Sequence, residues 1–183
     1  MRLFIGLDLP TGVIGSLERL IETLRPAARI QWSPPANLHI TTKFIGEWPE
    51  TRLEELKSAL SGLPARPPLA IHIREVGFFP NPRSPRVFWC GVEAPGLDAL
   101  AAATDRVTSA LGVPRETRPY SAHLTLARVK DRPLNLDSLH QRLAALPSRD
   151  FGRFEASSFF LYQSRLQPGG SVYTKLAEFP LSK

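Results

Sequence analysis

Two short His-x-Thr patterns hold the residues of this chain whose types and spacing suit acid-base chemistry. The first pairs His39 with Thr41, and the second pairs His123 with Thr125. Successive side chains of a β-strand point to opposite faces, so a spacing of two residues places each imidazole and its hydroxyl on one face. If the two strands face each other, a neutral imidazole can act as a base and a protonated one as an acid, with two hydroxyls to hold a phosphate. The patterns therefore favour phosphodiester chemistry without a metal.

The surroundings of the two patterns indicate an internal duplication. A single His-x-Thr pair carries little weight, because any half-exposed strand places polar residues on its wet face. Here the segments 38–45 and 122–129 share more than the pair: each has an apolar residue directly after the histidine and another six positions beyond it. We therefore expect two related halves, each supplying one histidine strand.

Length, composition and charge bound the class of protein. The chain has 183 residues, of which 43% are hydrophobic, as in one globular domain. No apolar run approaches the length of about 20 residues that a membrane-spanning helix needs, and the first eight residues resemble a first strand more than a signal peptide. Cys90 is the single cysteine, which excludes an internal disulfide and a thiolate metal site and predicts a cytoplasmic location. The net charge of +6 favours a polyanionic partner.

The elements that must position these residues alternate along the chain. Each half is expected to run strand, helix, histidine strand, helix, strand, which favours an α+β fold with antiparallel sheets. The loop 80–86 is expected to close a hairpin, 32–37 to form a turn, and Asn135 to cap a helix. The expected strands are 2–8, 38–45, 69–79, 87–92, 121–129, 151–163 and 171–179, and the expected helices are 10–25, 50–60, 95–111 and 135–146.

Further stretches resemble one known family. They are 37–41 (NLHIT), 44–47 (FIGE), 79–83 (FPNPR) leading to Trp89, 123–128 (HLTLAR) and 161–164 (LYQS), followed by Gly169, Tyr173 and Leu176. On these residues the chain is similar to the two-histidine (2H) phosphoesterase superfamily, and more closely to its RNA 2′,3′-cyclic phosphodiesterases, formerly called 2′-5′ RNA ligases. The resemblance spans nearly the whole chain. One departure is Ala122, where that group commonly has proline.

The resemblance implies a fold, an activity and roles for the two histidines. The implied fold is bilobal α+β with a pseudo-twofold axis, in which two antiparallel sheets line a central cleft and helices lie outside. It implies a single domain over 1–183 made of two interleaved lobes. The implied activity is hydrolysis of a terminal RNA 2′,3′-cyclic phosphate to a 2′-phosphate, with reversible 2′-5′ ligation and no metal or cofactor. By the resemblance His39 is the proton donor and His123 the proton acceptor, although the residues alone do not distinguish them.

Four further residues are candidates for substrate binding. Thr41 and Thr125 are expected to donate hydrogen bonds to the phosphate oxygens. The resemblance implies base stacking for Phe44 and phosphate binding for Arg128, each five residues after a histidine. Five is an odd number, so strict alternation turns both residues away from the histidines, and only a bulge or a strand end would bring them back. Packing of Phe44 in the core is an equally good interpretation.

Other functions and partners stay open at this point. One alternative is a protein that binds RNA ends without catalysis, and another is a 2H enzyme for small cyclic nucleotides or 2′-5′ oligonucleotides. We expect an RNA with a cyclic phosphate terminus as the partner, no membrane association and a monomer. His72 and His140 lack a threonine two residues later and are expected to face solvent.

Overall fold

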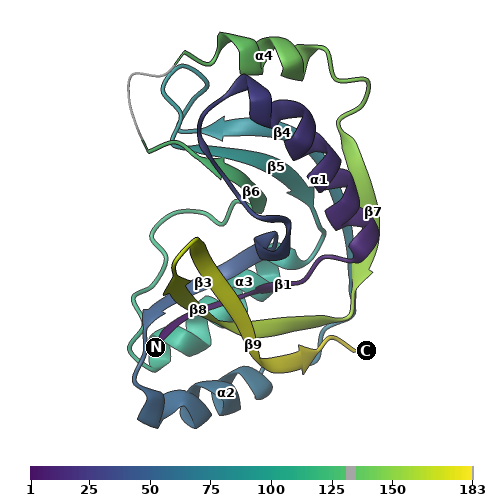
Figure 1. Cartoon of the computed structure of the whole chain (residues 1–183). Helices are drawn as coiled ribbons and strands as arrows, with labels where there is room; N and C mark the ends of the chain where they lie inside the picture. The colour runs from purple at the N-terminus through teal and green to yellow at the C-terminus, as the bar shows by residue number, and fades with distance from the viewer. Residues whose placement is uncertain (131–134, 183) are drawn as a thin grey trace.

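Two antiparallel sheets form the framework of the protein. The computed structural model describes residues 1–130 and 135–182, and in that part of the chain the strand orders are β3-β1-β8-β9 and β2-β6-β5-β4-β7 (Figure 1). The predicted α+β class with antiparallel sheets is confirmed. The four-stranded sheet contains β1 (Arg2–Leu7), β3 (Ile40–Glu47), β8 (Ser158–Gln167) and β9 (Gly170–Pro180), and the five-stranded sheet contains β2 (Gln31–Trp32), β4 (Leu69–Phe79), β5 (Val87–Glu93), β6 (His123–Arg128) and β7 (Asp150–Ala156).

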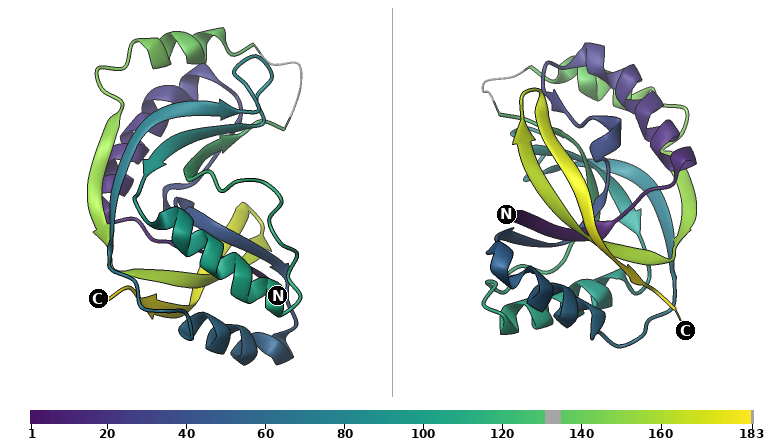
Figure 2. Two further views of the ribbon diagram at one scale, coloured as in Figure 1. Left: turned by 180° about the vertical axis from the view of Figure 1, so that it is seen from behind. Right: turned by 60° about the horizontal axis from the view of Figure 1, so that its bottom comes forward.

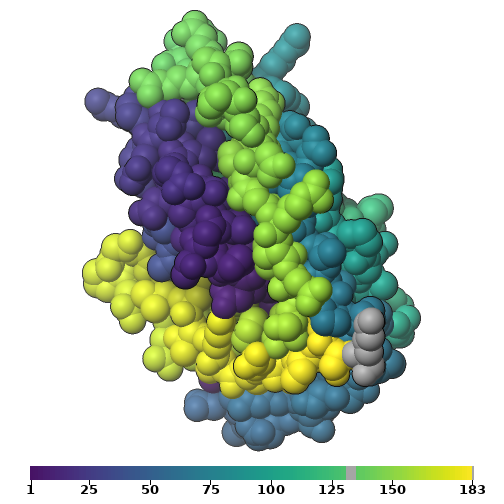
Figure 3. Space-filling model, turned by 90° about the vertical axis from the view of Figure 1, so that its right-hand side faces the viewer, coloured from purple at the N-terminus to yellow at the C-terminus, as the bar shows by residue number. Residues whose placement is uncertain are grey.

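The helices cover the faces of the sheets that carry no histidine. Helix α1 packs on β7 and α4, so it belongs to the five-stranded sheet although it follows β1 of the other sheet (Figure 3). Helix α3 follows β5 of the five-stranded sheet but packs on β3 of the four-stranded sheet (Figure 2). This exchange is compatible with interleaved lobes, while the single domain over 1–183 stays a prediction. The helices are α1 (Thr11–Leu24), α2 (Leu53–Ser61), α3 (Leu97–Ala110) and α4 (Asp137–Ala144).

The first helix shows how the sequence builds these layers. Five of its apolar residues recur at helical spacing and are buried on the side that packs on β7. Pro10 occupies the N-cap position, and a 3₁₀ turn that contains Pro26 follows Leu24. The helix predicted at 10–25 is therefore confirmed, and each of its ends differs by one residue. The buried residues of the helix are Val13, Leu17, Leu20, Ile21 and Leu24.

The predicted strand at 151–163 is wrong. The structure divides this stretch into β7 and β8, which belong to different sheets and are separated by Ser157. Leu181 N–H donates to the Ser157 carbonyl at 2.8 Å, which holds the chain where it crosses between the sheets. Phe159, Phe160 and Leu161 are all buried, so the apolar run shows no alternation that marks the crossing.

Several boundaries also differ from the prediction. The turn expected at 32–37 contains part of the short strand β2, which pairs with β6, and a 3₁₀ turn at Pro35–Asn37. The helix expected at 50–60 begins with a 3₁₀ turn, so α2 itself starts at Leu53. Helix α4 has Leu136 at its N-cap, although Asn135 Oδ1 accepts a hydrogen bond from the Asp137 N–H at 2.9 Å. The hairpin of β4 and β5 is confirmed.

Among the described residues, no helix is long and apolar enough to cross a membrane.

Candidate active site

The first histidine is held at the start of β3 by two hydrogen bonds. His39 Nδ1 lies 2.6 Å from the Asn37 carbonyl oxygen, and His39 Nε2 lies 2.9 Å from Thr41 Oγ1. The second contact confirms that the imidazole and the hydroxyl share one face. Because a carbonyl only accepts hydrogen bonds, Nδ1 carries the proton and donates it to Asn37. Nε2 is then the nitrogen that can exchange a proton with a substrate.

The second histidine repeats this arrangement in β6. His123 Nδ1 lies 2.8 Å from the carbonyl oxygen of Ser121, again two residues earlier in the chain. His123 and Thr125 are half-buried, whereas Leu124 and Leu126 between and after them are fully buried in the core. The predicted alternation of the second pattern is therefore confirmed. Both imidazoles use Nδ1 for a main-chain contact and leave Nε2 for chemistry.

Matching bulges in the two strands redirect the residues that follow. Gly6 pairs with Thr41 and Ile5 with Lys43, so Thr42 is an extra residue in β3. In β6 the register shifts between Thr125 and Ala127, so the extra residue is the one three positions after the histidine, as in β3. A bulge makes two adjacent residues point to the same side of the sheet, so the alternation shifts by one residue after it. The residue five positions after each histidine therefore points to the same side as that histidine.

Phe44 and Arg128 therefore lie on the histidine faces of their strands. Phe44 is 60% exposed, so the interpretation of Phe44 as a core residue is wrong. Its ring centroid lies 6.3 Å from that of Phe4, whose ring is also 4.7 Å from the His39 ring. Arg128 is exposed at the end of β6. The geometry permits substrate contacts by both residues, and their roles stay predictions.

An aromatic cluster surrounds His39. The Tyr173 ring meets the imidazole edge-on at 5.1 Å, and the buried Tyr162 ring stacks on Phe4 at 4.8 Å. With Phe160 these rings form a small apolar cluster that is separate from the main core. The sequence pattern did not single out Phe4, because β1 is an almost continuous apolar run without alternation. The cluster fixes the position of the His39 ring and partly removes it from water.

Burial and neighbouring charges favour the neutral form of His39. Burial is the main cause that lowers the pKa of His39 from its ordinary value of 6.5, while the hydrogen bond to Asn37 raises it. The charges of Arg128 and His123 lower this pKa further. Strands β3 and β6 contact each other directly, so the two histidine strands are brought together, as predicted.

We expect the His39 imidazole to titrate below pH 6.5 in the free protein and to titrate at higher pH after inorganic phosphate is added. An anion beside the ring stabilises the charged form, which opposes the effects of burial and of Arg128. Proton NMR of the imidazole Cε1–H signals over a pH series measures both values, and H39Q identifies the signal by its loss. A His39 signal that titrates at or above 6.5 without phosphate would contradict this assignment.

Two side chains tie the segment that precedes His123 to the strand of His39. Tyr120 Oη donates a hydrogen bond to the Thr41 carbonyl at 2.8 Å, and burial raises the pKa of Tyr120, so the hydroxyl keeps its proton. Lys43 Nζ donates to the Pro114 carbonyl at 2.8 Å. These contacts connect both ends of the 114–122 segment to β3, and so set the position of one histidine relative to the other.

The other two histidines contact residues outside this site. His72 is 6% exposed, with Nε2 2.9 Å from Asp150 Oδ2, so the prediction that it faces solvent is wrong. The two carboxylates beside it belong to Glu93 of β5 and Asp150 of β7. The sequence did not predict that β4 pairs with β7. His140 is half-buried, and its ring lies 5.2 Å from Phe78.

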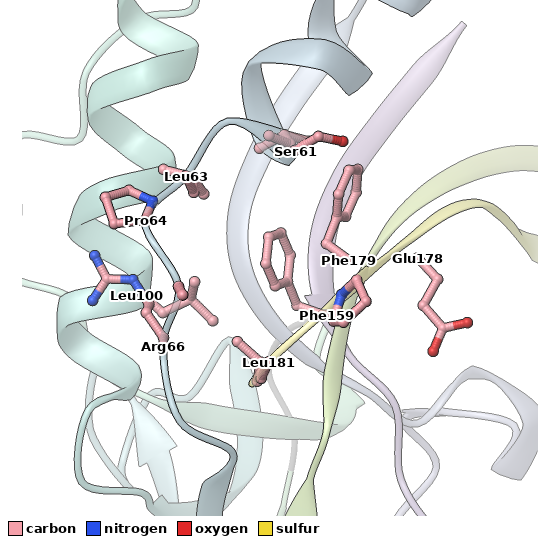
Figure 4. Close-up of a pocket in the computed structure, with 12 residues that line it drawn as sticks. Ser61, Leu63, Pro64, Arg66, Leu100, Phe159, Glu178, Phe179 and Leu181 are labelled. Carbon is pink, nitrogen blue, oxygen red and sulfur yellow. The ribbon is translucent and has the colours of Figure 1, made fainter. Parts of the chain in front are cut away.

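A small pocket elsewhere in the protein is unrelated to the histidines. It lies between α2, α3, the start of β8 and the end of β9, where Phe159 and Phe179 line it (Figure 4). Phe159 points to the opposite face of the sheet from Phe160, which belongs to the aromatic cluster beside His39. The two histidine strands therefore remain the candidate active site.

Known proteins resemble this chain over its full length. The LigT-like phosphoesterase family matches residues 7–89 and again residues 91–173. An RNA 2′,3′-cyclic phosphodiesterase of Methanothermobacter thermautotrophicus is 36% identical over 184 residues, which cover 99% of each chain. The crystal structure of TT0787 from Thermus thermophilus superposes with a TM-score of 0.84 at 32% identity, covering 99% of this chain and 98% of that one. LigT of E. coli, solved in complex with 3′-AMP, gives a TM-score of 0.81 at 26% identity and covers 100% and 98%.

The paired histidine strands and the two antiparallel sheets define a two-histidine phosphoesterase. The repeated match agrees with the duplication expected from segments 38–45 and 122–129. The chain belongs to the LigT-like phosphoesterase family.

Proposed function

We propose that this protein hydrolyses a terminal 2′,3′-cyclic phosphate of RNA to a 2′-phosphate, without a metal. The observation that carries the proposal is the repeated geometry of His39 and His123, which both donate Nδ1–H to a carbonyl and leave Nε2 for proton transfer. Curated relatives at 33–36% identity are named RNA 2′,3′-cyclic phosphodiesterases, which supports the same substrate class. The net charge of +6 suits a polyanionic substrate.

In the proposed mechanism the two imidazoles divide the proton transfers. His123 Nε2 removes a proton from the attacking water, whose oxygen forms a bond to phosphorus. The bond from phosphorus to the ribose 3′-oxygen breaks, and His39 Nε2 donates a proton to that oxygen. His39 must be charged to act as the acid, and the bound phosphate anion provides the stabilisation that burial removes in the free protein. In the reverse direction the 3′-oxygen attacks phosphorus and the two histidines exchange their roles, whereas a 5′-hydroxyl that attacks in place of water gives a 2′-5′ linkage with the roles unchanged.

The other site residues bind the substrate in this proposal. Thr41 and Thr125 donate hydrogen bonds to the non-bridging phosphate oxygens, where negative charge accumulates in the transition state. The Arg128 guanidinium adds a positive charge at the same place. The exposed ring of Phe44 stacks on the terminal base.

We expect T41V and T125V each to reduce kcat by about 10²-fold, because each variant removes one donor to the developing charge. T42V is the matched control: Thr42 lies next to Thr41 but is buried and donates to the Ile5 carbonyl of β1, so its loss affects stability rather than turnover. Rates on an RNA that ends in a cyclic phosphate measure all three variants. Equal losses in T41V and T42V would remove Thr41 from the phosphate site.

A panel of substrates tests the proposed function against its alternatives. We expect turnover of cyclic phosphate RNA to exceed that of ADP-ribose cyclic phosphate and of 2′-5′ oligoadenylate. A higher rate on either small substrate would instead identify a 2H enzyme for small cyclic nucleotides or for 2′-5′ linkages. Saturable, salt-sensitive binding of RNA ends without any product would identify a protein that only binds them.

We further propose that the protein acts as a monomer in the cytoplasm.

A further inference from the structure

A flat aromatic surface lies beside the second histidine strand. Trp89 of β5 pairs directly with Thr125 of β6 on one side and with Gly77 of β4 on the other. Directly opposed residues of an antiparallel pair project from the same face. The indole of Trp89 therefore lies on the face that carries Thr125 and His123.

The indole lies flat on the sheet because Gly77 has no side chain. A Cβ atom at Gly77 would lie 2.1, 2.4 and 2.7 Å from three neighbouring atoms of the Trp89 ring. An atom in the plane of the ring would approach only one ring atom so closely, so these distances place Gly77 under the face of the indole. One face of the half-buried ring is thus covered by β4, and the other is directed away from the sheet.

Phe79 connects this surface to the catalytic position. Its ring lies 5.2 Å from the Trp89 ring and meets the His123 ring edge-on, also at 5.2 Å. The loop that begins after Phe79 carries the exposed Arg83 and Arg86, and Arg86 N–H donates to the Phe79 carbonyl. We call Trp89 and Phe79 the aromatic shelf. Planar rings next to guanidinium groups are the combination that binds single-stranded nucleic acid.

We propose that Trp89 and Phe79 of the aromatic shelf bind the acceptor of 2′-5′ ligation, a second ribonucleoside whose 5′-hydroxyl takes the place of water. This inference rests on the proposed function, in which His39 and Phe44 hold the nucleoside that bears the cyclic phosphate. The shelf contacts His123, the proposed base, and therefore lies on the side from which the nucleophile approaches. An aromatic surface does not help to bind a water molecule. A nucleoside can stack its base on the surface, which positions its 5′-hydroxyl for attack.

The transfer step needs no other reactant. The 5′-oxygen of the second nucleoside forms a bond to phosphorus, and its proton passes to His123 Nε2. The bond from phosphorus to the 3′-oxygen of the first nucleoside breaks, and that oxygen receives a proton from His39 Nε2. The product is a 2′-5′ phosphodiester, and the shelf determines how often this product forms in place of the 2′-phosphate.

Competition between two acceptors tests the shelf. Adenosine 2′,3′-cyclic phosphate is supplied as the donor, with either methanol or a dinucleotide that has a free 5′-hydroxyl as the acceptor. In the wild-type protein we expect transfer to the dinucleotide to be saturable and, per mole of acceptor, at least about tenfold faster than transfer to methanol, as stacking of one base predicts. W89A should reduce the ratio of dinucleotide transfer to methanol transfer by about tenfold. W89F keeps a ring and should recover most of the ratio.

The outcomes separate this inference from the proposed function. Equal losses of dinucleotide and methanol transfer in W89A would show that the indole only supports the fold, and would overturn the shelf. Hydrolysis by the wild-type protein without a preference for the dinucleotide would overturn the shelf and leave the proposed function intact. A wild-type protein that does not hydrolyse the cyclic phosphate would overturn both.

Discussion

Replacement of His39 or of His123 by alanine reduces kcat for cyclic phosphate hydrolysis by about 10²- to 10⁴-fold, because each variant removes one of the two proton transfers. The two groups act as a unit, so we expect the double variant to lose little more than the single variants. Both histidines are half-buried, so we expect the variants to keep the fold. Single-turnover rates measure the loss, and thermal unfolding confirms that the variants remain folded.

H140A is the matched control for the histidine variants. His140 is half-buried against Phe78 on the other face of the five-stranded sheet, so its removal should change the rate by less than about twofold. If H39A or H123A retained the wild-type rate, that residue would be excluded from the mechanism. If H140A lost as much activity as H123A, the losses would reflect general damage to the sheet.

Replacement of Lys43 by methionine lowers the free energy of unfolding by about 3 kcal/mol, because it leaves the buried Asp105 carboxylate with only the exposed Arg115, at 3.6 Å, and the Glu116 N–H. Lys43 is 2% exposed, and its Nζ lies 2.7 Å from Asp105 Oδ1 and 3.2 Å from Glu116 Oε1. Burial alone raises the pKa of Asp105, but the hydrogen bonds from Lys43 and from the Glu116 N–H reverse this effect and hold the pKa below its ordinary range. Urea unfolding measures the loss.

K57M is the control for K43M. Lys57 forms an exposed ion pair with Glu54 on α2, at 2.9 Å, and such pairs contribute about 0.5 kcal/mol or less. The two variants make the same chemical change in a buried and in an exposed ion pair. Similar unfolding free energies for K43M and K57M would show that the Lys43 network adds no more than a surface contact.

The positions of Phe44 and Arg128 show where the sequence ceases to predict the site. Parity alone placed His39 with Thr41 and His123 with Thr125 correctly, because each pair lies within one regular stretch of strand. Beyond the threonines the outcome depends on bulges. The bulge in β3 arises from pairing with β1, and the bulge in β6 from pairing with β5. Such registers depend on strands that are distant in the sequence, so local alternation does not reveal them.

Burial of polar residues was equally hidden from the sequence. His72 lies on a strand that alternates as predicted, but its polar face is covered by Glu93 and Asp150 from the neighbouring strands. The division between β7 and β8 was missed because the single residue Ser157 separates two strands that pair with different sheets. In each case the decisive neighbour comes from another part of the chain.

The identity of the product tests the central claim most directly. An RNA that ends in a 2′,3′-cyclic phosphate is incubated with the protein and excess EDTA, and the position of the phosphate in the product is determined by ³¹P NMR. We predict a 2′-phosphate, formed at the same rate with and without the chelator, because His39 and His123 alone carry the protons. A 3′-phosphate, or an activity that EDTA removes and added metal restores, would contradict the account.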